Sequence, residues 1–246
     1  METLMIAFAA FLVAGFVKGV VGFGFPIIAL VILTLTVGLL DALAIILVPT
    51  LVTNIMQGLS GVYLLEIVRR MWRYFAVALV FIGLSSNYLT VVNVNWLTAL
   101  LGAVLFVFAL SRLFNVRFAI SRQREAPASL LLGAINGVLT GLTGSFMVPS
   151  VLYMQAIGFR GDLLVQAMGI FFALSTLVLA LSLGRHHLVS VEQAGLSTIA
   201  LAPSIIGLVA GRRARQLLDE KRFQQLFLAA LLLLGAYISY RSIRAI

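Results

Sequence analysis

Long apolar runs constrain the fold of this chain more than any other feature of its sequence. A helix needs about 20 mostly apolar residues to cross a bilayer. About eight such stretches follow one another, at residues 4–36, 42–65, 74–92, 96–114, 128–157, 163–183, 194–210 and 223–240. Because 62% of the residues are hydrophobic and only 10% are charged, no soluble fold could cover this apolar surface. We therefore predict an all-α, polytopic integral membrane protein, with residues 1–246 forming a single transmembrane domain.

The basic residues between these stretches predict the orientation, because cytoplasmic loops carry an excess of Lys and Arg. If every stretch crosses once, one face holds Arg69, Arg70, Arg73, Arg112, Arg117, Arg122, Arg124, Arg185, Arg241 and Arg244, and the other holds Arg160, Arg212, Arg213, Arg215, Lys221 and Arg222. We expect the first face to be cytoplasmic, which places both termini in the cytoplasm. The segment GRRARQLLDEKR opposes this orientation, and a re-entrant first or fifth stretch would change the number of crossings.

The net charge of +9 would suggest nucleic acid in a soluble protein, but here it fits anionic headgroups, so no nucleic-acid partner is expected. The absence of cysteine excludes disulfides and thiolate metal sites. His186 and His187 are adjacent and accompany no carboxylate cluster, so no metal or cofactor is expected. An intramembrane enzyme would need clustered carboxylates or a Ser/His pair at depth, and the chain lacks them. We therefore predict that it is not an enzyme.

Several aromatic residues fall near the ends of the apolar stretches, where interfacial anchors are common. They are Tyr63, Trp72, Tyr74, Trp96 and Tyr237. We expect these side chains to lie at the two membrane surfaces.

The two halves of the chain repeat one plan, which predicts repeat 1 over about 1–115 and repeat 2 over about 127–246. The first half reads GFVKGVVGFGFPIIAL from Gly15, and the second reads GAINGVLTGLTGSFMVPSVL from Gly133. The aligned pairs are Lys18 with Asn136, Gly19 with Gly137, Gly22 with Gly141, Gly24 with Gly144, Pro26 with Pro149, and Asp41 with Asp162. Each half thus opens with a Gly/Pro-interrupted helix, followed by three further spans.

Interrupted helices at matching positions in two halves are typical of a transporter's binding site. Glycine and proline let the backbone leave helical geometry. The freed backbone groups are tolerated in a membrane only where they are buried in protein or line a polar cavity. The start of the following half-helix carries partial positive charge and attracts anions. Close helix packing is an alternative role for the glycines, since both motifs contain G-x-x-x-G spacing, and both roles can hold together.

Lys18 is the sharpest single candidate, because it lies deep in the first apolar stretch, inside the first interrupted motif. An ionisable residue inside the membrane is a functional hypothesis by default. We expect it to be the counter-ion of an anionic substrate, and the alternative is a lysine that reaches to the interface. Asp41 and Asp162 start helices, where negative charge is ordinary capping, with proton coupling as the alternative.

The other candidates are polar groups and glycines that could line the same path. The predicted substrate-binding set is Lys18, Gly19, Gly22, Gly24, Asn54, Gln57, Asn136, Gly137, Thr140, Gly141, Thr143, Gly144, Ser145 and Gln166. Amide and hydroxyl groups can donate hydrogen bonds to an anion. They can also satisfy a helix break or join neighbouring helices, which is the alternative for Asn54, Gln57, Asn136 and Gln166.

The motifs VKGVVGFGFP and NGVLTGLTGSFMVP, with about eight spans in two halves, resemble the TauE/SafE sulfite exporter family over nearly the whole chain. The segment GLVAGRRARQLLDEKRFQQLFLAALLLLGAY is similar to the family's C-terminal stretch. The family's usual first motif is richer in glycine, near GxGGG, whereas Phe25-Pro26 follows Gly24 here. The resemblance implies export of small sulfur-containing or organic anions, such as sulfite or sulfonates, across the bacterial inner membrane.

We therefore expect a transporter that exports such an anion by alternating access, with the anion bound near the midplane between the two interrupted motifs. A passive anion channel and an accessory membrane subunit of a larger complex are the alternatives. The expected partners are the small anionic substrate and the lipid bilayer. Small-residue helix faces would allow a homodimer without requiring one.

Overall fold

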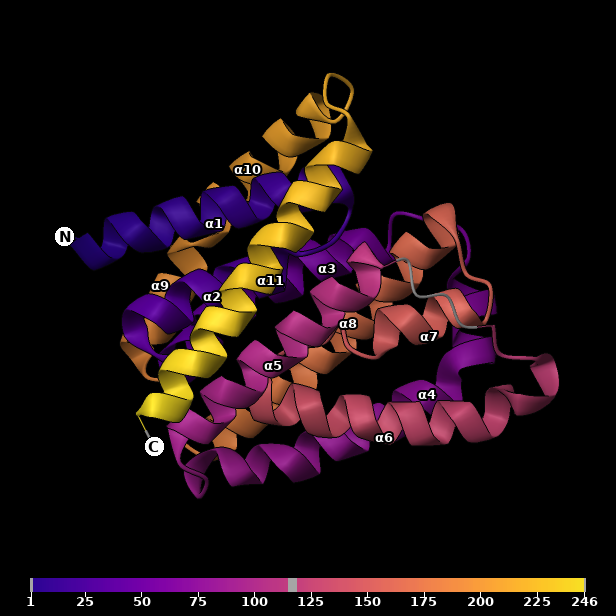
Figure 1. Cartoon of the computed structure of the whole chain (residues 1–246), viewed down its shortest axis with the longest axis horizontal. Coiled ribbons are helices and arrows are strands. Elements are labelled where there is room, and N and C mark those ends of the chain that lie inside the picture. The colour runs from indigo at the N-terminus through magenta and orange to yellow at the C-terminus, as the bar shows by residue number, and fades with distance from the viewer. Residues whose placement is uncertain (1, 115–118, 246) are drawn as a thin grey trace. The chain divides into compact units, whose positions relative to one another are not determined.

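The computed structural model describes residues 2–114 and 119–245, and these residues form helices and no strand (Figure 1). The long helices are α1 (Glu2–Val21), α3 (Leu39–Gly58), α4 (Leu64–Ser85), α5 (Val94–Leu113), α6 (Glu125–Thr143), α8 (Gly161–Arg185) and α11 (Glu220–Arg244). The shorter helices are α2 (Phe25–Val37), α7 (Ser150–Ala156), α9 (Val191–Ile199) and α10 (Leu201–Ala214), with 3₁₀ turns at Ser86–Thr90 and Arg122–Arg124. Arg117 and the side chain of Lys221, both used in the orientation estimate, lie outside the described residues.

Six helices in the described part are long and apolar enough to cross a membrane, rather than about eight. They are Leu39–Gly58, Val94–Leu113, Arg122–Thr143, Gly161–Arg185, Val191–Ala214 and Arg222–Arg244. Two physical features account for the difference. A helix break divides the first apolar stretch into two shorter apolar helices, Ala7–Val21 and Phe25–Val37. The third stretch lies in α4, which also carries Arg69, Arg70 and Arg73 in its first half.

The chain divides into two compact units. One contains Met1–Thr50, Asn93–Phe114 and His187–Ile246, and the other contains Leu51–Val92 and Asn115–His186. The expected repeats run along the sequence, whereas each unit takes segments from both repeats. The chain passes from the first unit into the second inside α3, immediately after Pro49 and Thr50. The unit that contains the N-terminus is unit 1, and the other is unit 2.

Glycine-lined helix contacts hold unit 1 together, and the closest is between α1 and α10. A Cβ atom added to Gly19 would lie 2.7 Å from the backbone nitrogen of Arg212 and 2.8 Å from the Cα of Gly211. On the opposing helix, a Cβ on Gly207 would lie 2.8 Å from the nitrogen of Phe16. The α5–α11 contact is built in the same way at Gly102 and Gly235. Only glycine lets these backbones approach so closely.

Unit 2 uses the same device where α6 packs on α4 and where the end of α3 crosses α8. A Cβ on Gly137 would lie 2.5 Å from the carbonyl oxygen of Ala78, and one on Gly141 would lie 2.7 Å from that of Ile82. A Cβ on Gly169 would lie 2.9 Å from the Cα of Gly58. The packing role that the sequence left as an alternative for Gly19, Gly137 and Gly141 is therefore present.

Aromatic rings fill the interior of unit 2. Tyr74 is fully buried and stacks on Tyr153, with ring centroids 4.7 Å apart, and Phe171 packs on Tyr74 edge-on. The expectation that Tyr74 is an interfacial anchor is therefore wrong, because its ring belongs to this cluster. Tyr63, Trp72, Trp96 and Tyr237 are exposed, as anchors should be.

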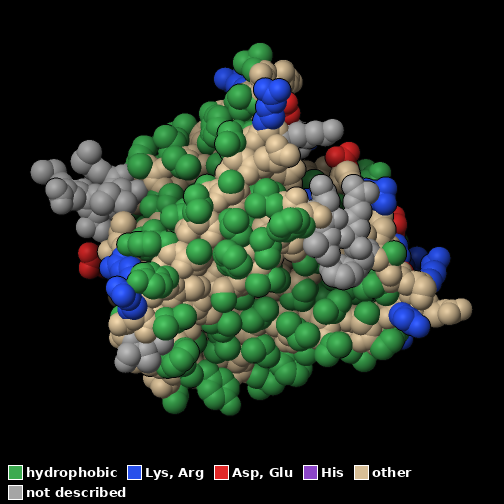
Figure 2. Space-filling model, in the orientation of Figure 1, with side chains coloured by type: hydrophobic (Ala, Val, Ile, Leu, Met, Phe, Trp, Pro, Cys, Tyr) green, Lys and Arg blue, Asp and Glu red, His purple; other side chains and the backbone are tan. Residues whose placement is uncertain are grey.

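Apolar side chains cover much of the surface seen in Figure 2. Leu131, Leu181, Leu226 and Leu233 each expose 60% or more of their surface. Water would not tolerate so much exposed hydrocarbon, whereas lipid tails solvate it. The chain is a multi-pass membrane protein.

Candidate functional site

The first interrupted motif breaks the helix as expected, between α1 and α2. Gly22 and Gly24 have φ values of 85° and 99°, a left-handed backbone that side-chain-bearing residues rarely adopt. The N–H of Gly22 donates to the carbonyl oxygen of Lys18 at 2.8 Å, which closes the last turn of α1. Pro26 then lies in the first turn of α2, where its missing N–H costs no helical hydrogen bond. The two glycines thus end one helix and start the next within three residues.

Lys18 lies in the last turn of α1, immediately before this break, and is only 4% exposed. The backbone nitrogen of Arg212, on α10 of the same unit, would lie 2.7 Å from a Cβ on Gly19, the residue that follows Lys18. The backbone of Arg212 is held there because α10 packs against Gly19. Two helices of unit 1 therefore bring Lys18 and the backbone of Arg212 close to one helix break, and the Arg212 side chain is exposed.

Arg212 is the residue that sequence reasoning missed. The sequence did contain a signal, because Gly207-x-x-x-Gly211 on α10 has the same spacing as Gly15-x-x-x-Gly19 on α1. Matching these two patterns would have placed α10 against α1 and Arg212 close to Lys18.

The second interrupted motif breaks the chain between α6 and α7, and its polar side chains satisfy the loop. The Nδ2 of Asn136 donates to the carbonyl oxygens of Phe146 at 3.2 Å and Val148 at 2.7 Å. The hydroxyl of Thr140 donates to the carbonyl of Ser145 at 3.0 Å. The hydroxyl of Thr143 accepts from the N–H of Ser145 at 3.2 Å and donates to the carbonyl of Leu139. Gly144, with φ 71°, caps α6. These residues maintain the helix break.

Two buried polar atoms of this motif have no hydrogen-bond partner among the described residues. They are the Oδ1 of Asn136 and the hydroxyl of Ser145, and both side chains are fully buried. A buried polar atom without a partner costs free energy, so such atoms often mark a site for a bound molecule. The Asn136 donors are already committed to the loop, which leaves its oxygen as an acceptor. The Ser145 hydroxyl can donate to an anion.

The amide side chains of α3 and α8 act as ties between these helices. The Nε2 of Gln57 donates to the carbonyl of Val165 at 2.8 Å. The Nε2 of Gln166 donates to the carbonyls of Gly58 and Gly61, both at 3.0 Å, and its Oε1 accepts from the N–H of Tyr63 at 2.9 Å. Asn54 is fully buried in the same unit. Gln57 and Gln166 therefore join neighbouring helices, which is the alternative role that the sequence left open for them.

The predicted site residues fall into two groups, each within one unit. Unit 1 contains Lys18, Gly19, Gly22 and Gly24, and unit 2 contains Asn54, Gln57, Asn136, Gly137, Thr140, Gly141, Thr143, Gly144, Ser145 and Gln166. Asp41 and Asp162 occupy the first turns of α3 and α8, in keeping with capping, and Asp41 also accepts a hydrogen bond from Gln193 at 2.7 Å.

No group of three or more His, Cys, Asp or Glu residues in the described part of the chain could hold a metal ion. His186 instead pairs with the side chain of Asn87 at 2.8 Å. The first motif contains a buried lysine in unit 1, and the second contains a buried hydroxyl without a hydrogen-bond partner among the described residues of unit 2.

A family model described as Sulfite exporter TauE/SafE matches residues 7–238, which include both helix breaks. The chain belongs to this family. TauE/SafE proteins form a transporter family, and membership supports a membrane transporter of sulfur anions. Comparisons with curated proteins and with solved structures return no match. The matched residues include Lys18 and Ser145.

Proposed function

We propose that this TauE/SafE protein exports a small sulfur-containing or organic anion, of the size of sulfite or a simple sulfonate, across the inner membrane by alternating access. The observation that carries the proposal is Lys18, buried at a helix break, with Arg212 on the helix that packs against the neighbouring Gly19. A buried cation in a membrane protein is expensive unless a charge or a ligand compensates for it. Lys18 and Arg212 supply the positive charge that replaces the water lost by the anion.

The second motif, within unit 2, offers neutral polar groups that an anion could contact on its path. The hydroxyl of Ser145 is buried and makes no hydrogen bond with the described residues, so it can donate without breaking a bond. The Oδ1 of Asn136 is an acceptor, and it would bind a protonated oxygen of the anion or a water carried with it. A site with both features favours oxyanions such as hydrogen sulfite over simple halides.

Helix contacts within the units support the proposed duplication. In the two expected repeats, α1 and α6 are the first long helices, and α4 and α10 belong to the third spans. The structure packs α1 on α10, and α6 on α4, so each first helix contacts the third span of the other repeat. The fourth helices, α5 and α11, pack on each other. Reciprocal exchange of this kind is expected if two homologous halves evolved together, as in transporters with internal repeats.

The test is flux through the purified protein in liposomes, with sulfite, sulfonates and simple carboxylates offered in turn. We expect saturable flux of one anion class. We expect Lys18→Ala and Arg212→Ala to raise the half-saturating concentration by about 10- to 100-fold, because each removes one charge-assisted hydrogen bond of about 1.5–3 kcal/mol. Arg213→Ala, which removes the charge of the next residue, exposed as Arg212 is, serves as the matched control and should behave as wild type.

Other results would replace the proposal. Normal transport by a correctly folded Lys18→Ala variant would remove this lysine from the site. Flux that rises linearly with concentration would indicate a passive anion channel. No flux of any of these anions would favour an accessory subunit of a larger complex.

A further inference from the structure

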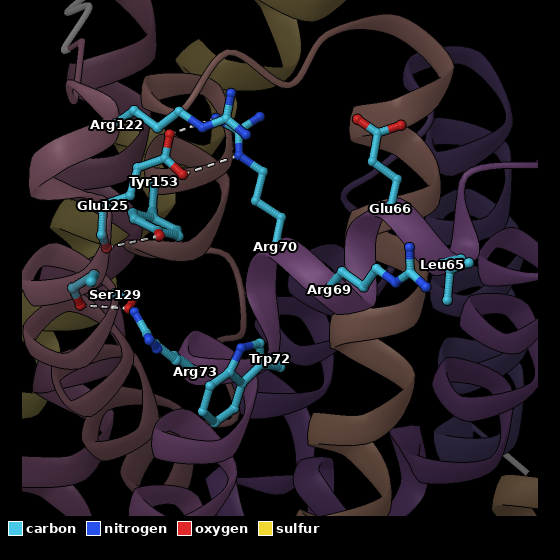
Figure 3. A pocket seen from close by; sticks show the side chains of 11 residues that line it. Leu65, Glu66, Arg69, Arg70, Trp72, Arg73, Arg122, Glu125, Ser129 and Tyr153 are labelled. Carbon is cyan, nitrogen blue, oxygen red and sulfur yellow. Dashed lines mark hydrogen bonds and ion pairs between the residues drawn. The ribbon is translucent and has the colours of Figure 1, made fainter.

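A basic cavity lies within unit 2, where the first turns of α4 approach the start of α6. Its volume is about 820 Å³. Four arginines and two glutamates line it, and Figure 3 shows them around one opening. They are Arg69, Arg70, Arg73, Arg122, Glu66 and Glu125. The proposed transport site uses none of these residues.

One ion pair builds the wall of this cavity. Arg70 binds Glu125 through two hydrogen bonds, Nε to Oε2 at 3.0 Å and Nη2 to Oε1 at 2.6 Å. The same Nη2 donates to the carbonyl of Ile157 at 2.7 Å, and the guanidinium lies 5.3 Å from the centre of the Phe159 ring. The hydrogen bond that Arg70 donates to Glu125 also raises the pKa of Arg70, which lies before the apolar stretch that begins at residue 74. This pair is fixed and electrically neutral.

The remaining charges give the cavity a positive excess. Arg69, Arg73 and Arg122 carry three positive charges and Glu66 carries one negative charge, so the excess is two positive charges. Neither Arg69 nor Arg122 forms an ion pair within the described part of the chain, and both side chains are exposed. Arg73 lies 5.3 Å from the centre of the Trp72 ring. These three arginines can therefore turn toward an anionic group without giving up an ion pair.

An apolar groove of about 450 Å³ continues from the cavity along α4 and α6. The two spaces share Trp72, Arg73 and Ala126, so they are contiguous. Beyond these residues the groove is lined by Ala76, Val77 and other apolar side chains, among them Pro127 and Leu130. It follows the part of α6 that lies within a candidate membrane span. The cationic cavity is thus joined to an apolar groove that faces lipid.

We propose that the cavity and groove together bind one anionic phospholipid. Its phosphate lies among Arg69, Arg73 and Arg122, and one acyl chain lies in the groove along Ala76, Val77 and Leu130. A small soluble anion would match only the cavity, and a neutral lipid would match only the groove. Exposed Trp72 at the junction suits the headgroup region, where tryptophan is favoured, and basic pockets between spans suit anionic headgroups.

Trp72 makes the site measurable, because the chain has only two tryptophans. In a Trp96→Phe background, fluorescence reports Trp72 alone. The protein is reconstituted with phosphatidylglycerol or phosphatidylcholine carrying brominated acyl chains, which quench a tryptophan that they touch. We expect half-maximal quenching at a phosphatidylglycerol fraction at least about 5-fold lower than for phosphatidylcholine.

Three variants then separate the possible ligands. Arg73→Gln with Arg122→Gln should abolish the preference for phosphatidylglycerol, whereas Arg160→Gln, an exposed arginine of the same unit, should retain it. Ala76→Phe fills the groove and should weaken quenching by phosphatidylglycerol. Equal quenching by both lipids in the parent protein would overturn the proposal. It would also fail if inorganic phosphate at about 10 mM, well above a micromolar affinity, displaced the lipid completely, because the ligand would then be a soluble anion.

Discussion

Replacing Gly137 by alanine tests whether the membrane helices depend on direct backbone contact. A Cβ at this position would lie 2.5 Å from the carbonyl oxygen of Ala78 and 2.5 Å from the Cβ of Phe81. Ordinary van der Waals contact begins at 3.4 Å, so α6 and α4 would have to separate by about 0.9 Å. Neither obstacle is the flexible end of a side chain, so the strain cannot be relieved locally.

Forced separation of a packed interface costs about 1–3 kcal/mol. For a chain of this length, 1 kcal/mol shifts the unfolding temperature by about 2–4 °C. We therefore expect Gly137→Ala to lower the Tm by about 2–12 °C, measured by thermal unfolding of the purified protein in one detergent. Anion flux should fall only as far as the fraction of folded protein falls.

Gly195→Ala is the matched control, since Gly195 lies inside α9 and an added Cβ there meets nothing within 4 Å. Alanine is favoured over glycine in a helix by about 1 kcal/mol, so this variant should be as stable as wild type or slightly more stable. If Gly137→Ala and Gly195→Ala had the same Tm, backbone contact at Gly137 would not determine the stability of the α4–α6 pair.

Three further substitutions test other parts of the structure. Gln166→Leu should lower the free energy of unfolding by about 2 kcal/mol, measured by thermal unfolding, because the carbonyls of Gly58 and Gly61 lose their hydrogen-bond donor. An unchanged Tm would mean that the Gln166 side chain does not stabilise the contact between α3 and α8. Ser145→Ala should reduce flux without lowering the Tm, since its hydroxyl bonds to no described residue, and reduced stability with normal flux would contradict a binding role. Arg70→Leu and Glu125→Leu should each lower the free energy of unfolding by about 1–2 kcal/mol, and the double variant should lower it by less than the sum of the two. A double-mutant cycle measures this coupling, and losses that simply add would mean that the ion pair contributes nothing to stability.

Much of the fold could be predicted because membrane helices leave a strong local signal. Apolar runs of the required length predicted the helices, and the glycines near residues 22 and 144 predicted where the first and fifth stretches break. The number of spans was less predictable, because a break shortens a helix by an amount that depends on packing. Tyr74 shows a second limit, since its position near a charged segment resembled an anchor, but stacking on Tyr153 buries it.

The candidate site was predictable in part for a similar reason. Lys18 could be found because a charge in an apolar run is conspicuous in one dimension. Arg212 could not be found by the same criterion, because it belongs to a basic segment and becomes significant only through the contact between α1 and α10. The hydrogen bonds of Asn136 also depend on the path of the loop, which decides that its donors face inward and its oxygen remains available.

The contact between α1 and α10 has a consequence for synthesis in the cell. Gly19 and the Gly211 that faces it are 192 positions apart in the sequence, so the first helix is made long before its partner. At about 5–20 residues per second, the ribosome needs roughly 10–40 s to reach Gly211. During this interval α1 must remain in the bilayer while Lys18 and its glycine face are not yet packed against α10. The insertion machinery therefore has to accept a helix that carries a lysine near its end before the helix that packs against it exists.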